Sequence, residues 1–399
     1  MRLNQDDDEN TVDAMTNDGH TEASGATDAL TADGTNEDAT RESTIRETMH
    51  DSPRVVLAAG TTETALIDGI SAAGAAPELL AHTPPADAEI LVYGEPVAAP
   101  VTPVSPTGCV TPAAATRAVR EVVGFPVTVV DAGLAESTAA PTVDVGAAPG
   151  EDVREPVAVA DARTIFERAV ALGATLPDER LVVGETIPGG TTTALGVLTA
   201  LGERAGVSSS LPNNPLERKR AVVDEALAAS GLEPGDCAES PLAAIECVGD
   251  PVQATVAGIA AGALESGTAV TLAGGSQQLA IAAVLRHTGV AESVEIATTS
   301  FVADDPSVDL ARAASRLDVE VRVTDPGFEE GLHVAMERYC AGEAKEGVAM
   351  GGALSLVPDG EMAAVRDRFA RVCDRLVADE PESEPSEHGP PGGNRTGVH

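Results

Sequence analysis

The two lysines of this chain, Lys219 and Lys345, are its most informative residues, because its other strongly basic side chains are all arginines. An ammonium is a compact point charge and a guanidinium is a planar fork, so a chain that almost excludes lysine is expected to keep it where a point charge is needed. Lys219 lies at the start of a helical pattern, and Lys345 directly precedes Glu346. Both segments are therefore candidate parts of a site.

Gly189 and Gly190 stand before a run of three threonines that begins with Thr191 and Thr192. This pattern places flexible backbone and hydroxyl groups at the start of a helix, where unpaired N–H groups and the helix dipole favour an anion such as phosphate. Capping of the helix would need only one of the threonines, so the cluster favours a ligand. We predict that Gly189, Gly190, Thr191 and Thr192 bind substrate.

A second glycine-rich segment follows the apolar run 269–273 and contains Gly274, Gly275 and Ser276. Loops that follow the strands of an open parallel sheet converge at one edge of the sheet, where ligands bind. Glycine-rich turns are also ordinary connectors between a strand and a helix. We expect Gly274, Gly275 and Ser276 to contribute to the same site as the threonine run.

Lys219 is flanked by Arg218 and Arg220, which brings three cations together in an acidic chain. These side chains could clamp a phosphate group. They could equally lie on a solvated helix face and pair with Glu217 and Asp224. The sequence leaves both interpretations open.

Glu346 lies between Lys345 and Gly347, before a run of small residues. Backbone approaches a ligand most closely at glycine, so the Glu346 carboxylate and Gly347 are candidate site residues. The alternative is a structural glutamate in a glycine-rich turn. Lys345 is expected either to tune this carboxylate or to pair at the surface, with the surface pair favoured.

Several common kinds of site are missing from the sequence. It contains no Gly-x-x-x-x-Gly-Lys-Ser/Thr phosphate loop, and no Gly-x-Gly-x-x-Gly fingerprint follows a strand, which argues against ATP hydrolysis and hydride transfer. The histidines lack metal-ligand spacing, and no Ser/His/Asp or Gly-x-Ser-x-Gly arrangement occurs. We therefore expect neither a metal nor a cofactor.

Short apolar runs alternate with helical patterns along the middle of the chain. Their continuous hydrophobicity suits strands covered on both faces, and so a three-layer, Rossmann-like α/β fold with a mostly parallel sheet. The expected strands are 55–59, 89–93, 127–131, 181–184, 269–273, 294–298 and 319–323. The expected helices are 160–173, 191–204, 217–229, 252–265, 276–287, 307–316 and 361–377.

The two ends of the chain differ from its middle. Residues 1–53 and 379–399 are rich in acidic and small polar residues and lack apolar periodicity, so both are expected to be disordered extensions of a folded region, 54–378. The net charge of -39 argues against nucleic acid and membrane as partners. Such acidity with so little lysine is typical of a cytoplasmic protein from a high-salt organism, and the N-terminus lacks the apolar core of a signal peptide.

The order and spacing of these motifs resemble the nicotinate-nucleotide:dimethylbenzimidazole phosphoribosyltransferase family over roughly residues 54–357. The chain is most similar to the archaeal branch of that family. The matching segments are Val129–Gly133, Gly184-Glu185 with Gly189 and Thr191-Thr192, Lys219–Ala226, Gly258–Gly262 leading into Leu272–Gly275, and Glu346-Gly347 with Gly351–Ala353.

The resemblance implies an α/β Rossmann-like domain with a small helical subdomain, in a homodimer. It implies transfer of phosphoribose from nicotinate mononucleotide to dimethylbenzimidazole, which yields alpha-ribazole 5'-phosphate and nicotinate during assembly of the lower ligand of cobalamin. Glu346 resembles the carboxylate that takes the proton from the incoming base. Glu185 and Lys219 resemble the supporting carboxylate and the phosphate-side lysine of the substrate pocket.

Two departures concern the acceptor base. The bacterial enzymes have a glycine where this chain has Ile187, followed by Pro188, and their Asp-His-Gly motif is replaced by the segment 60–64. A purine-like acceptor therefore stays open as an alternative. A non-catalytic nucleotide-binding regulatory protein is the second alternative.

Overall fold

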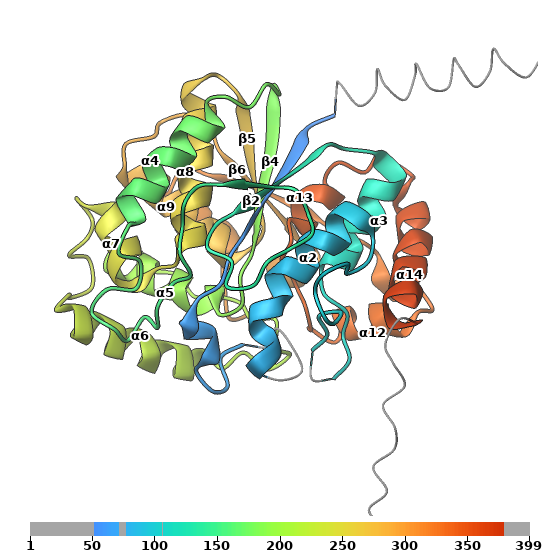
Figure 1. Ribbon diagram of the computed structural model, residues 1–399, viewed down its shortest axis with the longest axis horizontal. Helices are drawn as coiled ribbons and strands as arrows, with labels where there is room; N and C mark the ends of the chain where they lie inside the picture. Colours follow the sequence, from blue (N-terminus) through green and yellow to red (C-terminus); the bar gives the residue numbers. More distant parts are fainter. Residues whose placement is uncertain (1–51, 72–76, 106, 379–399) are drawn as a thin grey trace, which may run out of the picture. The chain divides into compact units, whose positions relative to one another are not determined.

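Seven strands form one parallel sheet in the computed structural model, which describes residues 52–71, 77–105 and 107–378 (Figure 1). The strand order is β3-β2-β1-β4-β5-β6-β7. The strands are β1 (Arg54–Ala59), β2 (Val127–Asp131), β3 (Thr142–Asp144), β4 (Arg180–Thr186), β5 (Ala269–Ala273), β6 (Glu295–Thr299) and β7 (Glu320–Thr324). The predicted fold class is confirmed.

The order of the strands reverses at β1, which pairs with β2 on one side and with β4 on the other. Ala59, the last residue of β1, is opposite Asp131 of β2 and Thr186 of β4. Connections leave this point toward opposite faces of the sheet, so a crevice opens at the carboxyl ends of the strands. The topology therefore marks the ends of β1 and β4 as the place for a ligand.

Helices cover both faces of the sheet, as Figure 1 shows for α4, α5, α8 and α9 on one side and α2, α3, α13 and α14 on the other. Val56 and Ala58 of β1 join the core beneath the first group, whereas Val55 and Leu57 join the core beneath the second. The first group comprises α4 (Ala162–Gly173), α5 (Gly190–Ala200), α6 (Leu216–Ser230), α7 (Pro241–Val248), α8 (Pro251–Glu265), α9 (Ser276–His287) and α11 (Leu310–Arg316). The second comprises α2 (Thr83–Tyr93), α3 (Ala113–Val123), α12 (Val334–Cys340), α13 (Met350–Leu354) and α14 (Met362–Ala378).

The remaining helices are short: η1 (Glu63–Leu66), η2 (Pro77–His82), α10 (Ser300–Ala303) and η3 (Phe328–Glu330). Local signals explain several helix starts. Asp250 and Gln253 form a reciprocal capping box at the start of α8, and Pro251 occupies its first position. Within α14, Val365, Phe369, Val372 and Leu376 are buried together, which confirms the core-facing stripe expected from their spacing.

One predicted strand is wrong. Residues 89–93 end helix α2, whose first turn carries Pro84 and Pro85, and Gly94 closes it in a left-handed conformation. Glu89 is buried because its carboxylate accepts hydrogen bonds from the backbone N–H groups of four residues, Val97, Ala98, Ala99 and Ala139. The apolar run after Glu89 therefore packs as a helix end.

The strand absent from the prediction is β3, a three-residue edge strand whose side chains are all exposed. It pairs only with β2 and has no apolar run to indicate it. The predicted extensions lie outside the described residues, apart from Ser52 and Pro53, so the domain boundaries stay a prediction. Among residues that the structure describes, no helix combines the length and apolar character needed to cross a membrane.

Candidate active site

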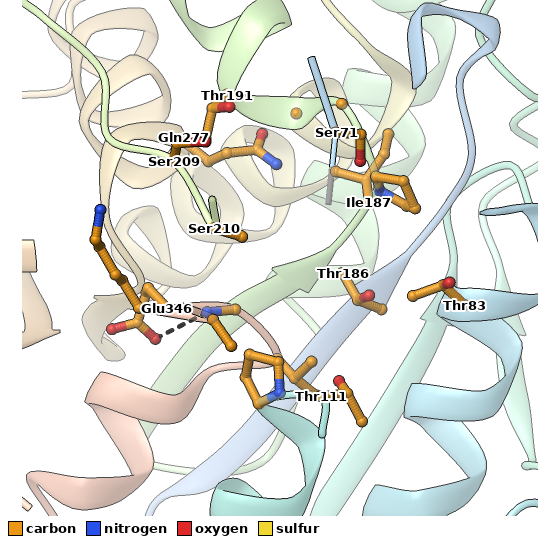
Figure 2. A pocket seen from close by; sticks show the side chains of 18 of the residues that line it. Ser71, Thr83, Thr111, Thr186, Ile187, Thr191, Ser209, Ser210, Gln277 and Glu346 are labelled. Atoms are coloured by element: carbon orange, nitrogen blue, oxygen red, sulfur yellow. Dashed lines mark hydrogen bonds between the residues drawn. The ribbon is translucent and has the colours of Figure 1, made fainter. Parts of the chain in front are cut away.

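A pocket with a cavity volume of about 140 Å³ opens at the carboxyl ends of the central strands (Figure 2). One side is formed by the end of β4 and by the segment 344–348 that precedes α13. The N-termini of α5 and α9 form the opposite side. The serines 208–210 connect the two sides, since the N–H of Ser208 donates to the hydroxyl of Ser276 and the carbonyl of Ser210 accepts from the N–H of Ala344. Residues of α2 and the segment 103–112 close the pocket from the second face of the sheet.

Glu346 is fixed by hydrogen bonds to both of its carboxylate oxygens. Oε1 accepts from the N–H groups of Gly347 (3.2 Å) and Gly351 (2.9 Å), and Oε2 accepts from the N–H of Thr299 (3.2 Å) and the hydroxyl of Thr298 (3.4 Å). Burial raises the pKa of Glu346 to about 7, although these four bonds oppose the rise. A carboxylate held in this way is poised to accept a proton near neutral pH.

Glu185, at the end of β4, is 7% exposed and also lines the pocket. Burial raises its pKa to about 8, and the negative charges of Asp250, Glu346 and Asp87 add to the rise. Within the described residues, no hydrogen bond reaches its carboxylate. Glu185 is therefore a buried acid whose ionisation depends strongly on any cation placed in the pocket.

Asp87 of α2 is a third carboxyl group in the pocket wall and, like Glu185, is buried. Its oxygens accept hydrogen bonds from the hydroxyls of Thr111 (2.6 Å) and Thr186 (2.7 Å). Burial raises its pKa to about 7 against the effect of these two bonds. Asp87 thus ties α2 to β4 and to the segment 103–112 beside the other two acids.

The opposite wall presents hydrogen-bond donors. Gly189, the N-cap of α5, has a φ of 82°, and Gly190, Thr191 and the start of α9 at Ser276 also line the pocket. The unpaired N–H groups at the start of a helix bind anions, and two such starts face one cavity here. In Figure 2, Thr191, Ser209 and Gln277 lie together on the side away from Thr186 and Thr111.

Lys219 lies behind this donor wall and is fully buried. Its Nζ donates to the hydroxyl of Thr191 (2.8 Å) and to the carbonyl of Ser208 (3.0 Å). Burial lowers its pKa to about 7, Lys345 lowers it further, and Asp305 opposes both. Arg218 and Arg220 are exposed on α6, so Lys219 alone of the three cations reaches the site.

Lys345 is buried in the pocket wall, and the expected surface pair is wrong. Its Nζ donates to Asp305 Oδ2 (2.8 Å), while Asp305 Oδ1 accepts from the backbone N–H of Ser307 (2.9 Å). Burial tends to raise the pKa of Asp305, but the bonds from Lys345 and Ser307 outweigh it and hold that pKa below its usual value. Lys345 therefore forms a buried ion pair next to Glu346.

The backbone around Glu346 is strained. Ala344, Val348 and Ala349 have φ values of 48°, 51° and 60°, and they are three of the four non-glycine residues with positive φ in the described part of the chain. Each costs of the order of 1–3 kcal/mol and persists only where neighbours hold it in place. Val348 is held on both sides, because its N–H donates to the carbonyl of Glu185 and its carbonyl accepts from the hydroxyl of Thr116.

Comparisons with known proteins agree with this geometry. A family model described as a phosphoribosyltransferase matches residues 95–299. The chain is 58% identical over 323 residues to the UPF0284 protein of Halobacterium salinarum, covering 80% of this chain and 97% of that protein. It is 42% identical over 335 residues to the UPF0284 protein of Methanosarcina mazei, covering 82% of this chain and 95% of that protein. The chain belongs to this phosphoribosyltransferase family.

Solved structures support the same fold for this phosphoribosyltransferase. CobT from Thermus thermophilus superposes with a TM-score of 0.52 at 20% identity, over 85% of this chain and 89% of that one. A nicotinate-nucleotide-dimethylbenzimidazole phosphoribosyltransferase from the same organism gives a TM-score of 0.51 at 19% identity, over 81% and 82% of the two chains. The family predicted from the sequence motifs, in its archaeal branch, is confirmed.

Most site residues predicted for the phosphoribosyltransferase line the pocket. These are Glu185, Gly189, Gly190, Thr191, Gly275, Ser276, Glu346 and Gly347. Thr192 and Gly274 do not line it: Thr192 is fully buried within α5, and the N–H of Gly274 donates to the carbonyl of Ala297. Lys219 does not line the pocket and reaches it through Thr191 and Ser208, which do. Contact with substrate stays a prediction for all of them.

Several residues of the pocket were not among the predicted site residues, namely Asp87, Thr186, Ser209, Ser210 and Gln277. Asp87 had the clearest signal that we overlooked. It follows the proline pair of α2 and precedes a buried apolar run, so its carboxyl group is buried and needs hydrogen-bond donors from the rest of the fold. Gln277 sits one residue after Ser276, inside a segment already marked by its glycines.

Proposed function

We propose that this phosphoribosyltransferase moves the phosphoribosyl group of nicotinate mononucleotide to a benzimidazole-type base. The products are alpha-ribazole 5'-phosphate and nicotinate, and the reaction serves the assembly of the lower ligand of cobalamin. The proposal is supported by the family, by the activity named for one structural neighbour, and above all by one observation. A hydrogen-bonded carboxylate with a pKa near 7, Glu346, shares a pocket with two helix N-termini.

The chemistry needs few groups. In nicotinate mononucleotide the pyridinium nitrogen is already cationic, so the bond from C1' to this nitrogen breaks with its electron pair passing to the ring, through an oxocarbenium-like transition state. The bond from C1' to the acceptor nitrogen forms. The bond forms through the unprotonated ring nitrogen of the base, and Glu346 accepts the proton that the base loses from its other ring nitrogen, which leaves a neutral base in the product.

The two walls of the pocket suit different parts of the donor nucleotide. The N-termini of α5 and α9 suit the phosphate, with Thr191 and Lys219 giving that wall its positive character. Glu185 and Asp87 face the cationic part of the donor from the acid side. An ionised carboxylate there stabilises the developing positive charge at C1' in a site that excludes water.

The direct test is incubation of purified protein at molar salt with nicotinate mononucleotide and dimethylbenzimidazole. We expect free nicotinate and a new riboside phosphate, both detected by chromatography. A panel of other bases, purines included, would show whether the acceptor differs. Binding of the nucleotide without release of nicotinate for any base would instead support a non-catalytic, regulatory protein.

The proposal includes two further properties, the oligomeric state and the place of action. The family resemblance supports a homodimer, and the acidic composition supports a high-salt cytoplasm as the place of action. Light scattering at molar salt would measure the mass of the assembly. A monomer at working concentration would contradict the dimer.

A further inference from the structure

Gln277 carries a hydrogen-bonding group that the protein itself does not satisfy. Its side chain comes from the second residue of α9, lines the pocket and is 5% exposed. Among the described residues, its Oε1 has no hydrogen-bond partner. A buried acceptor left unpaired is costly, and in a side chain that lines a pocket it points to a ligand that completes it.

The surrounding backbone makes room for this amide. A Cβ placed on Gly190 would lie 1.8 Å from Gln277 Nε2, so only glycine at this position lets the amide extend across the start of α5. Figure 2 shows Gln277 next to Thr191 and Ser209, directed into the pocket. The carboxamide is therefore part of the donor wall of the pocket.

The chemistry of the nucleotide selects its partner. A carboxamide always presents one acceptor oxygen, and that oxygen needs a donor. The phosphate dianion and the carboxylate of nicotinate offer only acceptors, and the N–H of the base is consumed by Glu346 in the proposed reaction. The two ribose hydroxyls are the remaining donors of the reacting pair.

We infer that Gln277 accepts a hydrogen bond from a ribose hydroxyl of the donor nucleotide and thereby selects ribose over deoxyribose. The inference rests on the proposed function and deepens it. A site built to bind a hydroxyl strongly rejects the analogue that lacks it, because the polar group of the protein is then left buried and unpaired. We expect a preference of at least about tenfold for the ribonucleotide.

The experiment compares nicotinate mononucleotide with its 2'-deoxy and 3'-deoxy analogues, in binding by calorimetry and in kcat/KM with dimethylbenzimidazole. Gln277→Met removes the acceptor at similar length and should reduce the preference to within about twofold. Gln277→Glu keeps an acceptor at the same position and should retain the preference for ribose. It should weaken the affinity for every nucleotide, since it adds a negative charge to the donor wall, where the phosphate is expected.

Gln278→Met is the matched control. Gln278 is fully buried next to Gln277, both of its polar side-chain atoms lack partners among the described residues, and it does not line the pocket. It should keep the wild-type preference. Thermal melting of each variant checks that it is folded.

The outcomes separate the two proposals. Turnover by the wild type with an unchanged preference in Gln277→Met overturns the role of Gln277 and leaves the proposed function standing. Binding with a Gln277-dependent preference but no release of nicotinate supports Gln277 and contradicts the proposed reaction. Equal affinity of the wild type for the ribo- and deoxyribonucleotides, or no binding of any of them, overturns the inference directly.

Discussion

The two walls of the pocket are built in different ways. On the acid wall, Glu346, Glu185 and Asp87 act through single side chains, each fixed or enclosed by its neighbours. On the donor wall, the N-termini of α5 and α9 act mainly through backbone N–H groups. The acid wall is therefore vulnerable to replacement of one atom, whereas the donor wall is vulnerable mostly to changes that move its backbone.

The largest effect is expected from Glu346→Gln. The amide keeps the shape but cannot accept the proton from the acceptor base, so kcat should fall by roughly 10²–10⁴ with little change in the affinity for nicotinate mononucleotide. Steady-state kinetics and calorimetry would separate the two quantities.

Glu295→Gln serves as the control for this variant. Glu295 begins β6, the strand whose last residue, Thr299, donates to Glu346, and it does not line the pocket. Its replacement should leave kcat within about twofold. A Glu346→Gln enzyme of normal kcat would remove Glu346 from the mechanism.

The next largest effect should come from Lys219→Met, which removes a buried support of the donor wall. Loss of the ammonium leaves the carbonyl of Ser208 without its bond and frees Thr191, so nucleotide affinity should drop about tenfold and the free energy of unfolding by about 1–3 kcal/mol. Lys219→Arg should fail to restore either quantity because the larger guanidinium does not fit a fully buried site.

Arg220→Met, on an exposed position of the same helix, is the companion variant for Lys219. Calorimetry and chemical denaturation would be run on all three proteins. Equal losses in the Lys219 and Arg220 variants would indicate a general loss of positive charge instead of a specific buried contact.

The pH dependence tests the acid wall as a group. Activity requires ionised Glu346, whose pKa is about 7, so kcat/KM should rise about tenfold per unit below pH 7 and level off above it. Stability should change in the opposite direction. The folded-state pKa of Glu185 is about 8 against a usual value of 4.5, so its contribution to stability is full below about pH 4.5 and is lost as the pH rises through about 8.

Melting temperatures between pH 5 and pH 8 would measure this loss in the wild type and in Glu185→Gln. The glutamine cannot ionise, so the variant should show a flatter profile. Parallel profiles for the two proteins would show that Glu185 ionises in the fold as it does in water.

The smallest effects are expected on nucleotide binding, and they should differ between the neighbouring residues Thr191 and Thr192. Thr191→Val removes a bond from Lys219 in the pocket wall and should weaken nucleotide binding several-fold. Thr192→Val should leave binding within about twofold, because the Thr192 hydroxyl is buried within α5 and has no partner among the described residues. Equal losses from the two variants would contradict the geometry of the donor wall.

The sequence predicted the class of fold and marked Glu346 as a candidate from local signals, whereas Glu185 was predicted from the family resemblance. Both acids line the pocket, and their roles stay predictions. Strands with continuous apolar runs, the helix start after Gly189, and the Glu346-Gly347 pair can each be recognised within about ten residues. Asp87 and Gln277 could not be placed in this way. Their roles depend on α2 meeting β4 and on Gly190 leaving space for an amide of another helix, contacts between segments about 90–100 residues apart in the chain.

The same limit explains two of the predictions that were wrong. The run 89–93 satisfies an apolar strand pattern, yet it ends a helix, and the Glu89 carboxylate accepts from backbone N–H groups beyond that helix, at residues 97–99 and at Ala139. For Lys345, the resemblance assigned the chemistry to its neighbour Glu346 and left a surface pair as the favoured expectation, whereas Lys345 pairs with Asp305 inside the fold.

The left-handed residues Ala344, Val348 and Ala349 have a consequence for the engineering of heat resistance. A selection for higher melting temperature would favour glycine at these positions, where it relieves the backbone. The higher melting temperature would then come with a more flexible segment around Glu346, which holds that carboxylate in position. Thermostable variants found at these three positions should therefore turn over more slowly, and those found in the strands of the sheet should not.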